Sequence, residues 1–90
     1  MTPDGAPEII ETVRGVLRDV LGIGAERAAA FDDITPLFGA LPELDSMAVA
    51  SVLTELEDRL GILIDDDEVD GEMLETFGAL CNFAIGKALA

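Results

Sequence analysis

Three stretches of this chain place apolar residues at the three- and four-residue spacing of an amphipathic α-helix, and this pattern constrains the fold more than any other feature. The stretches cover about residues 8–21, residues 46–60, and a segment from 75 or 76 to 88. Their apolar stripes are Ile9, Val13, Val16, Leu17 and Val20, then Val49, Val52, Leu53, Leu56 and Leu60, then Phe77, Leu80, Cys81, Ala84 and Ile85. Three such helices predict an all-α bundle.

The connection between the first two predicted helices is long and covers residues 23–45. Residues 25–30 predict a short helical turn, whereas the aspartate, proline and glycine residues that follow predict irregular structure. A loop of this length in a compact domain tends to be functional. Six large apolar residues predict that it is ordered and fastened to the core: Phe31, Ile34, Leu37, Phe38, Leu41 and Leu44.

The connection before the last helix predicts one further short helix. Residues 62–64 are apolar but too few to predict a strand, and Asp65 or Asp66 is placed to cap a helix that continues to about Val69. The sequence therefore predicts a four-helix bundle, with three main helices, a short third helix and a long first loop, in a single domain over residues 1–90. Residues 1–7 predict a loose lead-in, because they contain two prolines and a glycine.

The chain is strongly acidic, and its charge limits the partners that it can bind. Nineteen acidic residues against five basic ones give a net charge of −14. Such a surface repels nucleic acid and anionic lipid and favours basic patches on other proteins. No apolar run reaches the length of a membrane span, and the first residues do not resemble a signal peptide, so we expect a cytoplasmic protein. Nothing in the sequence indicates an oligomer, and we expect a monomer.

The residue types that the chain lacks exclude several kinds of chemistry. It contains no histidine, so a Ser-His-Asp triad, a Cys-His pair and the usual Cys/His zinc site are all excluded. The single cysteine, Cys81, rules out an internal disulfide and lies on the apolar stripe of the last helix, where we expect a buried core residue. We therefore expect a protein without catalytic activity of its own.

An acidic run near the third helix raises a calcium hypothesis. Asp66, Glu68 and Asp70 alternate and are followed by Gly71, as in an EF-hand loop. The twelfth loop position requires a bidentate glutamate but is Phe77, so the pattern does not predict an EF-hand. Loose binding of a divalent ion by the acids of residues 65–75 stays open.

Ser46 is the one residue whose position suggests a covalent modification. It directly follows Asp45 where a loop gives way to a helix, outside the apolar stripe. Backbone N–H groups are free at such a helix start and the dipole favours an anion, so a hydroxyl there can carry a phosphodiester. The alternative is an acidic helical interaction or regulatory module, in which Ser46 serves only as an N-cap.

These residues resemble the acyl carrier proteins. The family has Asp-Ser-Leu or Asp-Ser-Met at the start of the second of four helices, and this chain has Asp45, Ser46 and Met47 there. The similarity extends to residues 35–39 (Thr-Pro-Leu-Phe-Gly), to residues 64–69 and to residues 73–83, and covers about residues 8–88.

The resemblance implies that Ser46 carries a covalent 4′-phosphopantetheine, donated by coenzyme A and attached by a separate phosphopantetheinyl transferase, with Asp45 and Met47 flanking the site. The arm then holds acyl groups as thioesters for acyl ligases, acyltransferases or synthases of a lipid, polyketide or other specialised pathway. It also implies acids that dock to basic patches on these partners: Glu55, Glu57, Asp58, Asp66, Asp67 and Glu68. The implied acyl pocket is lined by Phe38, Val49, Leu53, Leu56 and Ile64.

Two departures refine the resemblance. Fatty-acid carriers place acids two and five residues after the serine, where this chain has Ala48 and Ser51. The chain also lacks the Gly-Gly-His-Ser or Gly-Gly-Asp-Ser form of the peptidyl carriers. We therefore expect a specialised, free-standing carrier rather than the housekeeping fatty-acid type.

Overall fold

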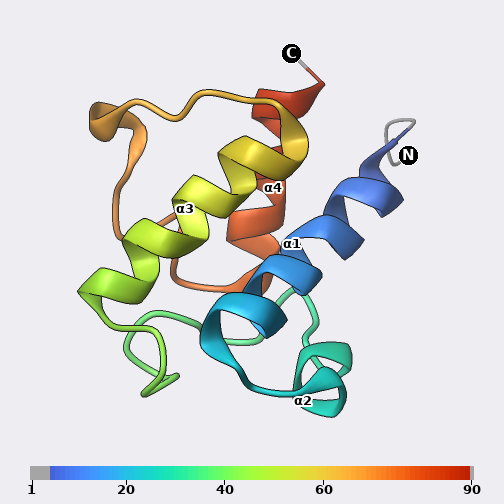
Figure 1. The fold of residues 1–90 in the computed structure, drawn as a ribbon, viewed down its shortest axis with the longest axis vertical. Coiled ribbons are helices and arrows are strands. Elements are labelled where there is room, and N and C mark those ends of the chain that lie inside the picture. The colour runs from blue at the N-terminus through green and yellow to red at the C-terminus, as the bar shows by residue number, and fades with distance from the viewer. Residues whose placement is uncertain (1–4, 90) are drawn as a thin grey trace.

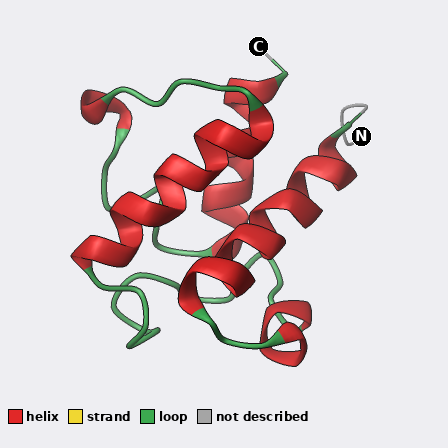
Figure 2. Ribbon diagram, in the orientation of Figure 1, coloured by secondary structure: helices red, strands yellow, loops and turns green. Residues whose placement is uncertain are grey.

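The computed structural model describes residues 5–89, and this part of the chain is helical and contains no strand. In chain order the elements are α1 (Ala6–Leu21), α2 (Ala25–Ala29), α3 (Ser46–Leu60), the 3₁₀ helix η1 (Asp66–Glu68) and α4 (Phe77–Ala88) (Figure 1). Colouring by secondary structure shows that long loops separate α2 from α3 and α3 from α4 (Figure 2). The predicted all-α bundle with three main helices is confirmed.

Helix α1 begins two residues earlier than the sequence predicted. Pro7 lies in its first turn, where a missing N–H breaks no helical hydrogen bond, so the helix starts at Ala6 rather than Glu8. The predicted loose lead-in is therefore wrong for residues 6 and 7, and residues 1–4 lie outside the described residues. The helix ends at Gly22, which adopts the left-handed conformation with φ 63° that a C-cap requires.

Side-chain caps fix the starts of α3 and α4. The Asp45 carboxylate accepts a hydrogen bond from the Ala48 N–H, and the Thr76 hydroxyl accepts one from the Ala79 N–H. Each cap satisfies a donor that would otherwise lack a partner at the helix end, a contribution of about 1 kcal/mol. Both bounds of α3 agree with the prediction, and α4 starts at Phe77, one residue after the later of the two predicted starts, because Thr76 is its cap.

The core lies where α1 packs against α3 and α4. In Figure 1, α1 and α3 lie side by side with α4 behind α3, and α1 contacts both. The largest fully buried side chains of the core come from all three helices and from the first long loop: Leu17, Val13, Val16, Val52, Leu56, Phe77, Leu80 and Leu37. Burial of each leucine stabilises the fold by about 2–3 kcal/mol.

The long connection between α2 and α3 is ordered, as predicted, but only part of it is buried. Phe31, Leu37 and Leu44 are buried, whereas Ile34 is 81% exposed and Phe38 is 49% exposed. The loop pairs with the chain ahead of α4: the Leu37 and Phe38 N–H groups donate to the Glu75 and Leu74 carbonyls at 2.9 and 3.0 Å. In such extended pairing, neighbouring side chains point to opposite sides, so Leu37 enters the core and Phe38 does not.

The predicted third helix is shorter than expected. It is one 3₁₀ turn, Asp66–Glu68, and it ends before Val69. Asp65 and Glu68 form a capping box, and the Lys87 ammonium of α4 binds Glu68 at 2.8 Å. None of the three residues of η1 is buried, so no apolar packing extends the turn into a longer helix.

Candidate functional site

Ser46 is the first residue of α3 and is exposed. The residue that caps the helix is Asp45, whose Oδ1 accepts from the Ala48 N–H at 2.8 Å. The reading of Ser46 as an N-cap is therefore wrong. Within residues 5–89 the Ser46 hydroxyl has no hydrogen-bond partner, so its oxygen is free to be modified.

Two contacts hold the loop that leads into α3. Leu44 is buried, and the Arg27 guanidinium of α2 binds both oxygens of the Glu43 carboxylate at 2.6 and 3.3 Å. Hydrogen bonding to Arg27 lowers the pKa of Glu43, which keeps this ion pair charged. The position of Ser46 therefore rests on an anchored segment rather than on a free loop.

A cavity of about 330 Å³ lies beside Ser46. Phe38 from the first long loop and Val49 from α3 form one part of its wall, and the segment after η1 forms the other. It is lined by Phe38, Ser46, Val49, Val69, Asp70, Gly71 and Leu74. Apart from Ser46 and Asp70 the lining is apolar or glycine, so the serine hydroxyl stands at the edge of a site suited to an apolar group.

The predicted acyl-pocket residues do not all line one cavity. Phe38 and Val49 line the cavity beside Ser46, and Leu53 and Ile64 line a second one of about 220 Å³. Val69 lines both, so the two cavities are neighbours along α3. Leu56 is fully buried in the core and lines neither of them.

Sequence reasoning missed four cavity residues: Val69, Asp70, Gly71 and Leu74. They follow the short acidic turn, and the hydrogen bonds of Phe38 to Leu74 and of Leu37 to Glu75 hold this segment against the first long loop. The available signal was Gly71, because a glycine interrupts a helix.

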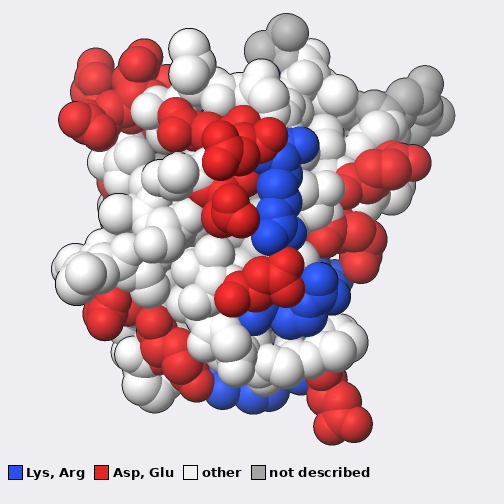
Figure 3. All heavy atoms as spheres, in the orientation of Figure 1, with Lys and Arg blue, Asp and Glu red and all other residues white. Residues whose placement is uncertain are grey.

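The six predicted docking acids fall into two groups. Glu55 binds Arg59, Glu68 binds Lys87, and the Glu57 carboxylate accepts from the Ile64 N–H at 2.8 Å. Within residues 5–89, the side chains of the other three have no partner: Asp58, Asp66 and Asp67. Figure 3 shows acidic side chains gathered at the upper left, the corner that η1 occupies in Figure 1. The free carboxylates thus lie towards the end of α3 and over η1.

The start of α3 is uncharged by contrast. Its first turn contains no acid, and Met47, next to Ser46, is 82% exposed. Ala50 and Ser51 are also exposed. Met47, Ala50 and Ser51 therefore give the start of α3 an uncharged, partly apolar surface next to Ser46, bordered by the exposed cap residue Asp45.

The chain's own thiol is unsuited to carry cargo. Cys81 is 4% exposed, and burial raises its pKa to about 12 because the thiolate cannot be solvated there. Among residues 5–89, no three His, Cys, Asp or Glu side chains are placed to hold a metal ion. No helix in the described part of the chain is long and apolar enough to cross a membrane.

Comparison with known proteins agrees with this geometry. A family model described as a phosphopantetheine attachment site matches residues 11–84. The solution NMR structure of a holo acyl carrier protein from Nitrosomonas europaea is similar, with a TM-score of 0.79 and 43% sequence identity over 86% of this chain and 92% of that chain. No curated protein matches the chain.

Proposed function

Because this chain belongs to the acyl carrier protein family, which carries a covalent 4′-phosphopantetheine, we propose that Ser46 is the attachment residue and that the loaded carrier serves a specialised acyl pathway. One observation supports this assignment above all. Ser46 is exposed and is not the helix cap, and its hydroxyl stands at the edge of an apolar cavity.

The residues around Ser46 fit a phosphodiester. The N–H groups of Ser46 and Met47 are the first two of α3 and have no acceptor within the helix, and the helix dipole places positive potential there. The Asp45 carboxylate is bonded to the Ala48 N–H. This bond holds it at the cap, where it leaves the serine oxygen clear.

The arm supplies the reactive thiol, and the protein supplies apolar surface for the attached acyl group. When bound, phosphopantetheine supplies an accessible thiol, which Cys81 cannot do because it is buried. Phe38, Val49 and Leu74 offer apolar surface to an attached acyl group. Gly71 also lines the cavity, and nothing lies within 4 Å of where its Cβ would be, so the space next to it is open.

The charge distribution indicates the partners of this carrier. Its substrates would be delivered and used by acyl ligases, acyltransferases or synthases, after a separate phosphopantetheinyl transferase has attached the arm. Asp58, Asp66 and Asp67 are free to meet basic patches on these enzymes. The neutral surface of Met47, Ala48 and Ser51 favours enzymes of a specialised lipid, polyketide or related pathway over those of housekeeping fatty-acid synthesis.

Intact mass after incubation with coenzyme A and a broad-specificity phosphopantetheinyl transferase tests the assignment. The wild type and Ser51→Ala should each gain one phosphopantetheine, and Ser46→Ala should gain none while keeping its helical circular dichroism. Ser51 is the matched control because it is the only other serine and is exposed on the same helix. Full loading of Ser46→Ala would refute the proposal.

A further inference from the structure

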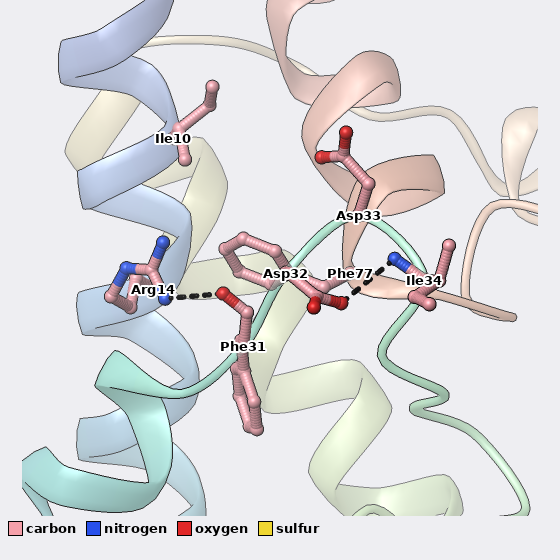
Figure 4. A pocket seen from close by; sticks show the side chains of 7 residues that line it. All are labelled: Ile10, Arg14, Phe31, Asp32, Asp33, Ile34 and Phe77. Atoms are coloured by element: carbon pink, nitrogen blue, oxygen red, sulfur yellow. Dashed lines mark hydrogen bonds between the residues drawn. The ribbon is translucent and has the colours of Figure 1, made fainter.

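A separate cleft, of about 480 Å³, shares no lining residue with either of the two cavities along α3, one of which is the cavity beside Ser46. Helix α1 supplies Ile10 and Arg14, and the loop after α2 and the start of α4 supply the rest (Figure 4). The Ile34 cleft, as we name it, is lined by Ile10, Arg14, Phe31, Asp32, Asp33, Ile34 and Phe77. The acyl carrier function described above uses none of these residues.

Much of the Ile34 cleft is apolar surface that is held in place. The rings of Phe31 and Phe77 pack with centroids 5.6 Å apart, and the Arg14 guanidinium lies 4.8 Å from the centre of the Phe77 ring. The Arg14 Nη1 also donates to the carbonyls of Ala28 and Phe31 at 2.6 and 3.0 Å. These contacts form a firm base for the cleft.

Ile34 is exposed because an ordered turn presents it. The Ile34 N–H donates to Asp32 Oδ1 at 3.1 Å, and the Gly78 and Phe77 N–H groups donate to the carbonyls of Asp33 and Thr35 at 3.1 and 2.9 Å. Gly78 approaches this turn so closely that a Cβ there would lie 2.6 Å from the Asp33 carbonyl oxygen. The 81% exposure of Ile34 is therefore built into the fold.

The charge of the Ile34 cleft favours a cation. Arg14 is already paired with Glu11 at 3.1 Å and bonded to two carbonyls, so its charge is engaged within the chain. The Asp33 side chain has no hydrogen-bond or ion-pair partner in residues 5–89, and Asp32 Oδ1 bonds only within its own turn. A protein with net charge −14 also attracts basic surfaces and repels both anionic lipid and a second copy of itself.

From these observations we propose that the Ile34 cleft is a second protein-docking surface. Its occupant is a partner segment with a lysine or arginine next to a large apolar side chain. The apolar side chain packs on Ile34 and Ile10, over the buried Phe77 ring, and the basic group meets Asp33. Because the cleft and the site at Ser46 share no residues, a segment held in the cleft contacts none of the residues that line the cavity beside Ser46. This proposal does not depend on which residue carries the arm.

The test uses isotope-labelled protein and amphipathic helical peptides, followed by NMR amide shifts. A leucine/lysine peptide should shift Ile34, Asp33 and Phe77 more than residues of α3 and η1. A serine/lysine peptide of equal charge and a leucine/glutamate peptide should leave the Ile34 cleft unchanged. Shifts centred on α3 or η1, or equal binding of either control peptide at the cleft, would overturn the proposal.

Variants distinguish peptide binding at the Ile34 cleft from non-specific electrostatic attraction of a basic peptide to an acidic protein. Ile34→Ser should weaken binding of the leucine/lysine peptide about tenfold, and Asp33→Asn should weaken it several-fold. Leu63→Ser and Glu26→Gln are the matched controls, because Leu63 is also 81% exposed and the exposed Glu26 side chain has no partner in residues 5–89. Equal losses in the control variants would overturn the proposal. Two further results would also overturn it. One is a wild-type dimer in sedimentation that Ile34→Ser abolishes, and the other is wild-type binding to anionic vesicles that Ile34→Ser abolishes.

Discussion

The connection before α3 and the connection after it both line the cavity beside Ser46, but they are held differently. The first, residues 30–45, buries Phe31, Leu37 and Leu44 and pairs its backbone with the chain ahead of α4. The second buries no residue between 61 and 72 and is held chiefly by hydrogen bonds and ion pairs of Glu57 and Glu68. Segments with few buried apolar contacts open at low cost in free energy. The cavity therefore has a fixed wall at Phe38 and a more easily displaced wall at residues 69–71.

The largest expected difference between the connections concerns buried leucine. Leu37→Ala should lower the free energy of unfolding by about 2–4 kcal/mol, because Leu37 is fully buried and its removal leaves a void. Leu63→Ala in the second connection should change it by less than about 0.5 kcal/mol, because Leu63 is 81% exposed. Urea denaturation of both variants measures this, and equal losses would show that the two connections are held alike.

A pair of glycines gives the next largest effect. Gly78→Ala should lower the free energy of unfolding by about 1–3 kcal/mol, because the new Cβ would meet the Asp33 carbonyl oxygen at 2.6 Å and force the paired backbones apart. Gly71→Ala in the second connection has open space and should be neutral or slightly stabilising. Thermal unfolding compares them, and a neutral Gly78→Ala would contradict the fixed wall.

The smallest effect concerns the ion pair that ties η1 to α4. The hydrogen bond from Lys87 lowers the pKa of Glu68 below its usual 4.5. Because folding lowers this pKa, the pair stabilises the fold at neutral pH, and that stabilisation is lost as the pH falls from about 4.5 through the lowered value. Glu68→Gln should therefore unfold at a slightly lower temperature than the wild type at pH 7, and the difference should disappear in acid.

Asp67→Asn is the control for this pH dependence, because Asp67 carries the same charge in the same turn without a partner in residues 5–89. It should not lower the unfolding temperature at pH 7. A loss equal to that of Glu68→Gln would show that the effect comes from the charge of η1 and not from the bond to Lys87.

Local patterns in the sequence predicted the helices and their ends well. The bounds of α3 and the start of α4 follow from apolar periodicity and from the caps Asp45 and Thr76, which act within a few residues. The same reasoning placed α1 two residues late, because Pro7 reads as a break although it is tolerated in a first turn.

Long-range pairing could not be predicted in the same way. The exposure of Ile34 and Phe38, and the presence of Val69 and Leu74 around the cavity, depend on residues 33–38 meeting residues 74–78. That contact joins segments about forty positions apart, and no local pattern specifies it. The place of Ser46 at the start of α3 was predictable from sequence, because the Asp45 cap and the apolar stripe that define this helix start come from neighbouring residues.

Locating the arm on the loaded protein tests the central claim most directly. Tandem mass spectrometry of peptides from the coenzyme A-treated wild type should place one phosphopantetheine on Ser46 and none on Ser51 or Thr54, the other hydroxyl residues of α3. An arm on either of those residues, or no arm on a correctly folded protein, would contradict the account.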